Sequence, residues 1–141
     1  MEISDKLIQE IVHRVVQEAA KASSPGFEKQ IAPSGVIGIK TSTVQCEPFG
    51  QPGVTLKDVV TLEESPRMGC GLMELDHTSF EWTLTYDEFI SVLDGTLEIE
   101  TDGTVITGNR GDILHIPKGS HVHYQTPTTA RYAYFVYPAN W

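Results

Sequence analysis

The chain has few cysteines, and it has no long apolar run. Its 141 residues include only Cys46 and Cys70, with no C-x-x-C pair, so a disulfide framework is not expected and two isolated thiols suit a reducing cytoplasm. No apolar run approaches the roughly 20 residues of a membrane span. The acids Glu2 and Asp5 stand where a secretory signal would need an uninterrupted apolar block. These absences predict a cytoplasmic protein that has no membrane partner.

Basic residues are also scarce. The chain has 10 lysines and arginines against 19 aspartates and glutamates, which gives a net charge of -9. A surface this acidic repels nucleic-acid phosphates and anionic membranes, so no nucleic-acid partner is expected. Nucleotides would be repelled as well unless a basic cluster or a divalent cation intervenes. There is no Gly-x4-Gly-Lys-Ser/Thr loop, so nucleotide binding of the P-loop type is excluded.

Residues 1–22 are predicted to form an amphipathic helix. Apolar residues recur at three- and four-residue steps from Ile3 to Ala20, and Ser4 is a candidate N-cap. The segment 23–34 contains Pro25 and Gly26 and is predicted to be a linker. The apolar stripe has two interpretations. It packs on its own barrel or on a dimer partner, or it docks on another protein as a short targeting helix.

From residue 35 onward the pattern changes to short β-leaning runs that are separated by Gly and Pro turns. Asp94-Gly95 and Asp102-Gly103 are each predicted to form a tight hairpin. This many strands without a second helix predict an antiparallel β-barrel or jelly roll over residues 35–141. The expected strands are residues 36–39, 59–62, 69–75, 87–93, 96–101, 104–107, 113–116, 121–125 and 131–137.

The spacing of two motifs indicates which kind of β-barrel this is. Six residues separate Glu88 from Gly95, and Gly111, Pro117 and Gly119 have the spacing G-x5-P-x-G. This spacing resembles the end of the first motif and the start of the second motif of the cupin family. The resemblance implies a mainly β fold, a single cupin (jelly-roll-like) β-barrel in which the two motifs meet across one cavity.

The histidine pair of the first cupin motif is missing. Counting back from Glu88 puts Trp82 and Leu84, or Glu81 and Thr83, where the resemblance implies two imidazoles. On a strand, Trp82 and Leu84 would share one face with Glu88. Because Trp and Leu cannot ligate a metal, we expect no tightly bound iron, manganese, nickel or zinc.

Glu88 is the first candidate for chemistry because it stands at the position of the family's carboxylate. It is either a Mg²⁺ contact or a base, or else a half-buried, hydrogen-bonded acid near the barrel mouth. Tyr86 and Asp87 adjoin it on that strand, and Tyr86 would share its face. Tyr124 lies on a later strand. Such tyrosines either form the walls of a small polar site or are ordinary core.

The remaining candidates are imidazoles and cations. His121 and His123 flank the offset of the family's lone histidine, so a one-residue bulge would be needed to turn either ring inward. His115 is expected to be buried and hydrogen-bonded. Arg110 and Lys118 are candidate phosphate contacts if they gather at the barrel mouth, and they are solvated charges if they do not.

Three segments, residues 80–88, 116–121 and 137–141, are similar to those of the EutQ family, cupin-type proteins of bacterial ethanolamine utilisation. The resemblance covers roughly residues 35–141; family members can carry a longer N-terminal region. It implies acetate kinase activity, in which acetyl phosphate and ADP give acetate and ATP or the reverse. Mg²⁺ would accompany ATP or ADP, with Glu88 and Asp87 as its contacts.

The same resemblance implies a bacterial microcompartment, where shell or cargo proteins are possible partners. A non-catalytic binding or assembly module of the microcompartment is the alternative. A homodimer is expected because the barrel exposes strand edges and the N-terminal helix has an apolar stripe to bury.

Overall fold

The computed structural model describes residues 26–140, which belong to two compact units, Met1–Gln45 and Cys46–Trp141. The predicted helix over residues 1–22 therefore lies outside the described residues. We expected the barrel to begin at residue 35, whereas the boundary between the units follows residue 45. Within residues 26–140, no helix has the length and apolar character that crossing a membrane requires.

The described part of the first unit is a small hairpin. Strand β1 (Lys29–Ile31) pairs antiparallel with β2 (Ile37–Ile39), and the 3-10 turn η1 (Thr41–Thr43) follows. The backbone amide of Glu28 donates to Thr43 Oγ1 over 2.8 Å, which ties the turn to the start of the hairpin. Strand β1 falls in the segment that we expected to be a linker.

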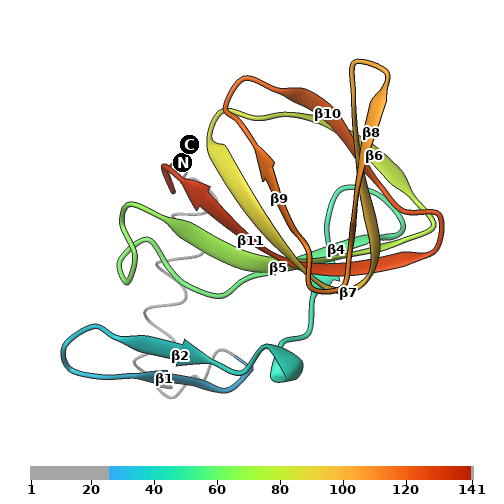
Figure 1. Ribbon diagram of the computed structural model, residues 1–141. Coiled ribbons are helices and arrows are strands. Elements are labelled where there is room, and N and C mark those ends of the chain that lie inside the picture. Colours follow the sequence, from blue (N-terminus) through green and yellow to red (C-terminus); the bar gives the residue numbers. More distant parts are fainter. Residues whose placement is uncertain (1–25, 141) are drawn as a thin grey trace. The chain divides into compact units, whose positions relative to one another are not determined.

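The second unit is one antiparallel sheet of nine strands that curls into an open barrel (Figure 1). Its order is β3-β4-β5-β11-β7-β10-β6, and β8 and β9 also pair with β7. The predicted cupin-type β fold is confirmed. The strands are β3 (Glu47–Pro48), β4 (Val54–Asp58), β5 (Gly69–Asp76), β6 (Ser79–Thr83), β7 (Asp87–Thr101), β8 (Thr104–Asn109), β9 (Ile113–Ile116), β10 (His121–Gln125) and β11 (Thr129–Tyr137).

Strand β7 runs through the whole barrel. It has 15 residues; its first half lies between β11 and β9, and its second half lies between β8 and β10. The predicted hairpin at Asp94-Gly95 is wrong, because this pair lies inside β7. Gly95 has a φ of 77°, and the register between β7 and β11 shifts beside it. The dipeptide therefore bends a continuous strand from one side of the barrel to the other.

The second Asp-Gly prediction is confirmed. Asp102 and Gly103 have φ of 48° and 82° and join β7 to β8, where Thr101 pairs with Thr104. The prediction of a strand at 59–62 is wrong, since β4 ends at Asp58. Thr61 and Glu64 instead close a turn, in which each side chain accepts a hydrogen bond from the other residue's backbone amide.

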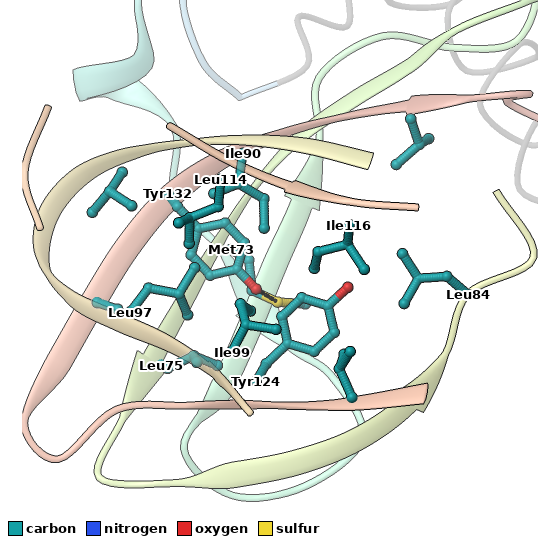
Figure 2. Packing of buried hydrophobic residues seen from close by; sticks show 14 of the residues in the cluster. Met73, Leu75, Leu84, Ile90, Leu97, Ile99, Leu114, Ile116, Tyr124 and Tyr132 are labelled. Atoms are coloured by element: carbon teal, nitrogen blue, oxygen red, sulfur yellow. Dashed lines mark hydrogen bonds between the residues drawn. The ribbon is translucent and has the colours of Figure 1, made fainter. Parts of the chain in front are cut away.

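Apolar side chains from opposite walls of the curled sheet fill the barrel (Figure 2). Leu97 and Tyr132 have no exposed surface, and the Tyr132 hydroxyl donates to Met73 Sδ over 2.7 Å. Burial of each such side chain contributes about 1.5–3 kcal/mol to folding. The cluster consists of Val54, Met73, Leu75, Leu84, Tyr86, Ile90, Val92, Leu97, Ile99, Leu114, Ile116, Val122, Tyr124, Ala130, Tyr132 and Val136.

Candidate functional site

The candidate site is built on the inward-facing residues of the segment that leads into β7. Leu84, Tyr86 and Glu88 are buried and Trp82 is half-buried, whereas the residues between them are exposed. This alternation is what a strand-like segment produces when one face meets the core. The four side chains therefore share the inner face, as the sequence predicts.

Glu88 is a buried acid in an otherwise apolar and aromatic interior. Its side chain is 4% exposed, and it is the one buried charged residue among residues 26–140. The Tyr124 hydroxyl on β10 donates to Glu88 Oε1 over 2.5 Å. Burial raises the pKa of Glu88 from 4.5 to about 7, although the Tyr124 hydrogen bond opposes that rise. Near neutral pH both the protonated and the ionised form of this carboxyl group are therefore populated.

Three tyrosines surround this carboxyl group and stay protonated. Burial raises the pKa of Tyr86, Tyr124 and Tyr132, and the negative charge of Glu88 raises all three further. Tyr86 accepts a hydrogen bond from Trp82 Nε1 over 2.8 Å. The acid is therefore held among neutral hydroxyl groups.

An aromatic row extends from this cluster toward solvent. The ring of Phe49, in the turn between β3 and β4, is centred 6.5 Å from the Trp82 ring. Phe49 is 39% exposed. A further aromatic contact joins Phe80 to Tyr124, the hydrogen-bond partner of Glu88, with stacked rings whose centroids are 4.8 Å apart. Neither Phe49 nor Phe80 could be predicted from the sequence, because nothing in the spacing of either residue links it to a motif.

Asp87 does not lie with Glu88. Adjacent residues of a strand point to opposite faces, and Asp87 Oδ1 accepts a hydrogen bond from the backbone amide of Lys118 over 2.8 Å. Arg110 precedes the four-residue strand β9 and Lys118 follows it, and both are exposed. The structure thus places the two candidate phosphate contacts at opposite ends of a strand and does not gather them.

The paired histidines face away from the barrel interior. Strand β10 pairs with β6 in regular register, so Val122 and Tyr124 point inward while His121 and His123 point outward. His121 Nε2 lies 2.5 Å from Glu81 Oε2, and His123 Nδ1 lies 3.0 Å from Glu100 Oε1. No bulge interrupts this register, so the condition that the sequence sets for an inward-facing imidazole is not met.

His115 also differs from its prediction, because it is exposed. It occupies the outward position on β9 between the buried Leu114 and Ile116. Its Nδ1 donates to the backbone carbonyl of Glu88 over 3.0 Å, and its ring is centred 4.5 Å from that of Phe89. The expected hydrogen bond is present, but the expected burial is not.

The residues of the interior do not fit a cupin transition-metal centre. Trp82 and Leu84 occupy the inner-face positions where imidazoles would stand, and neither side chain can ligate. In the part of the chain that the structure describes, no three His, Cys, Asp or Glu residues are grouped to hold a metal ion. A Mg²⁺ ion that arrives with a nucleotide would belong to the substrate.

Comparisons with known proteins agree with this barrel. Residues 2–141 match the family described as "Ethanolamine utilisation protein EutQ". A Clostridioides difficile protein named "Acetate kinase EutQ" is 40% identical over 99% of this chain and 94% of its own length. A Salmonella typhimurium protein of the same name is 33% identical, and the chain spans 64% of its length.

Solved structures give the same relationship. The Clostridium difficile EutQ structure has a TM-score of 0.79 and 44% sequence identity, covering 82% of this chain and 90% of that one. A cupin domain from Schizosaccharomyces pombe, at 14% identity and a TM-score of 0.60, covers 73% of this chain and 74% of its own and shares the fold alone. Because the family match covers residues 2–141 of this chain, the chain belongs to the EutQ family of ethanolamine utilisation proteins.

Proposed function

We propose that this protein catalyses acetate kinase-type phosphoryl transfer between acetyl phosphate and ADP. The observation that carries the proposal is the 40% identical relative, which is named an acetate kinase and which this chain covers almost completely. The buried acid Glu88 supplies a residue on which the chemistry can depend. Asp87, Arg110 and Lys118 lie on the outer side or in exposed turns, so Glu88, Tyr86 and Tyr124 are the first residues to test.

Phosphoryl transfer depends on positioning and charge neutralisation, usually with Mg²⁺ bridging phosphate oxygens. Mg²⁺ prefers oxygen ligands, which Glu88 can supply directly or through water. The Tyr124 hydroxyl fixes one carboxyl oxygen of Glu88 at 2.5 Å, so Tyr124 is a positioning residue for the acid. In this proposal Mg²⁺ also offsets the repulsion between nucleotide phosphates and a chain of net charge -9.

ATP formation from acetyl phosphate, ADP and Mg²⁺ by the purified protein tests the proposal. Glu88→Gln removes the charge that would hold Mg²⁺, and we expect a loss as large as that of other positioned catalytic groups, about 10²-fold or more in rate. Glu98→Gln is the matched control, because Glu98 lies on the same strand, on the outer side, and accepts a hydrogen bond from Gln125. Activity that is absent in the wild type, or unchanged in Glu88→Gln, would contradict the proposal.

A second candidate is a non-catalytic binding or assembly module. One observation favours it: among the residues that the structure describes, no lysine or arginine is buried, and phosphate groups in the barrel would lack a cationic partner from the inner face. Two results together would support this candidate. The purified, folded protein would form no ATP, and the Glu88→Gln variant would still bind its partner proteins.

We further propose a location in a bacterial microcompartment, with shell or cargo proteins as partners. The proposal rests on the family relationship and on the amphipathic pattern of residues 1–22, which lie outside the described residues. A fluorescent reporter fused to residues 1–22 should form puncta with shells, and Ile11→Glu with Val15→Glu should abolish them. A diffuse signal in the presence of shells would contradict docking by this segment.

A further inference from the structure

We propose that the barrel interior binds a small primary ammonium ion, with the nitrogen at the Glu88 carboxylate and the Tyr124 hydroxyl oxygen. This inference goes beyond the proposed phosphoryl transfer, because it needs neither a nucleotide nor acetyl phosphate. It rests on three features of the described residues, namely an uncompensated buried carboxyl group, a carboxyl oxygen with a vacant hydrogen-bonding position, and an aromatic row that reaches solvent.

The first feature is the missing countercharge. Removal of a carboxylate from water is unfavourable unless a cation or several hydrogen bonds replace the lost hydration. Glu88 is 4% exposed, and none of the described lysines, arginines or histidines is buried beside it. Arg131, the basic residue on the neighbouring strand β11, is instead paired with Glu74 on β5. A ligand that brings its own positive charge would supply the missing countercharge.

The second feature is the hydrogen bonding of the carboxyl group. Tyr124 donates to Glu88 Oε1, and within residues 26–140 no partner contacts Oε2. A carboxylate accepts several hydrogen bonds, and a primary ammonium group carries three N–H donors with no acceptor. Tyrosine oxygens also accept, so the nitrogen can bind Glu88 Oε2 and the Tyr124 hydroxyl oxygen together. Buried polar atoms in native proteins are rarely left without partners.

The third feature is the aromatic row, which indicates the ligand class. Phe49 is partly exposed, its ring adjoins Trp82, and Trp82 Nε1 donates to the hydroxyl group of Tyr86, the neighbour of Glu88 on the inner face. Aromatic faces attract cations, and Trp does so most strongly. Anions gain nothing from this row, and the chain's net charge of -9 repels them. Without a metal cation to neutralise an anion, the site thus favours a small amine over an anionic ligand.

Binding should depend on pH because a proton competes with the ammonium ion. The pKa of Glu88 is about 7, so the carboxylate dominates above that pH and the neutral acid dominates below it. A primary ammonium group keeps its own proton up to about pH 10, as a lysine does. Affinity should therefore be highest between these limits and should fall about tenfold per pH unit below pH 7.

Isothermal titration calorimetry with ethanolamine hydrochloride tests the inference on the full chain. Ethylene glycol is the neutral isostere and tetramethylammonium is the cation without N–H donors. At pH 8 we expect saturable binding of ethanolamine, weaker binding of tetramethylammonium and none of ethylene glycol. Equal binding of ethylene glycol, tetramethylammonium that binds as tightly as ethanolamine, or no binding of ethanolamine would overturn the inference.

Two variants assign the binding to the carboxyl group. Glu88→Gln keeps the shape and removes the charge, so affinity should fall about tenfold or more and lose its pH dependence. Glu98→Gln changes the net charge equally on the outer side and should bind as the wild type does. Tyr124→Phe removes the hydrogen bond that lowers the pKa of Glu88, so the pH midpoint of binding should rise. Unchanged binding by Glu88→Gln or an unmoved midpoint in Tyr124→Phe would contradict the assignment.

The inference and the proposed function fail separately. Kinase activity without amine binding would overturn only the ammonium site. Amine binding without ATP formation would overturn the proposed reaction and leave the ammonium site intact. The two assays therefore need the same preparation of protein.

Discussion

Burial of Glu88 links the chemistry of the site to the stability of the fold. Its pKa is about 7 in the folded protein against an ordinary 4.5, so the folded state holds the proton more tightly than the unfolded state does. The contribution of Glu88 to stability is therefore fully present below pH 4.5. It declines as the pH rises and is lost above about pH 7, where the folded state must also ionise.

We predict that, between pH 4.5 and pH 8, the free energy of unfolding of the wild type falls by on the order of 3 kcal/mol relative to that of Glu88→Gln. Glutamine cannot ionise, so this part of the pH dependence disappears in the variant. Urea unfolding at both pH values measures the difference, and Glu98→Gln should behave as the wild type. A parallel pH dependence in the wild type and Glu88→Gln would contradict the raised pKa.

Gly95 is a second residue on which the barrel depends. A Cβ atom there would lie 2.1 Å from the carbonyl oxygen of Thr129, and the φ of 77° is unfavourable for other residues. We predict that Gly95→Ala destabilises the protein by about 2 kcal/mol or more, because both strain and a backbone clash must be relieved. Thermal or urea unfolding measures the loss.

Gly103→Ala is the matched control for Gly95→Ala. Gly103 has a φ of 82°, but no atom lies within 4 Å of the position that an alanine methyl group would take, so only backbone strain is added. The expected loss is about 1 kcal/mol. Equal losses at the two positions would show that the approach of β11 to Gly95 is not close enough to matter.

At the scale of single elements, β10 separates the interior from the acidic outer face. His121 and His123 pair with Glu81 and Glu100 on the outer side, while Tyr124 on the inner side reaches Glu88. Exposed ion pairs contribute about 0–1 kcal/mol each. A strand can therefore lose its outer pairs without moving the residue that holds the acid.

We predict that His121→Gln with His123→Gln lowers stability by less than about 2 kcal/mol and leaves the activity and ligand binding of the barrel unchanged. The measurement is urea unfolding together with the ATP-forming and calorimetric assays. Tyr124→Phe on the same strand is the contrasting variant. A double histidine variant that loses activity while remaining folded would place an imidazole in the site after all.

Comparison of individual elements shows what the sequence could predict. The runs 113–116 and 121–125 became β9 and β10 with the expected bounds, because alternation and flanking turns agree there. The hairpin prediction at Asp94-Gly95 was wrong because an Asp-Gly pair suits a hairpin and a bend within a strand equally. Only the pairing with β11 decides between them. Residues 59–62 have strand propensity, but the local Thr61–Glu64 hydrogen bonds prevail.

The site shows the same division between local and long-range information. The inward position of Glu88 follows from alternation, which the sequence displays. Its contact with Tyr124 joins residues 36 positions apart, and the row through Phe49 depends on where the turn after β3 lies. The orientation of His121 and His123 depended on the absence of a bulge, which a single sequence does not reveal.

At the scale of the whole molecule, the outer face of the sheet bears exposed apolar side chains. Phe89 and Phe135 are cross-strand neighbours on β7 and β11, and they are 53% and 38% exposed. Ile113 on β9 is 70% exposed, and Tyr137 on β11 is 55% exposed. These four side chains offer roughly 400 Å², about half of the ~800 Å² that each partner buries in a standard interface.

We propose that a second copy of the chain covers this face and forms a homodimer. Phe135→Glu should shift the protein toward monomer, because a carboxylate at the centre of an apolar interface must be desolvated. Sedimentation velocity at micromolar concentration measures the change. Lys118→Glu, an exposed substitution outside the four apolar residues, is the control. A wild-type monomer, or a dimer that Phe135→Glu leaves intact, would contradict this interface.

The continuous course of β7 has a consequence for the changes of length that this chain can tolerate. Because side chains alternate along the strand, deletion of one residue between Glu88 and Gly95 would exchange the inner and outer faces of everything on one side of the deletion. The acid would leave the barrel, or the apolar residues that follow it would enter solvent, while four neighbouring strands kept their spacing. A substitution in β7 therefore changes one side chain, whereas an insertion or deletion there changes the orientation of every residue on one side of it.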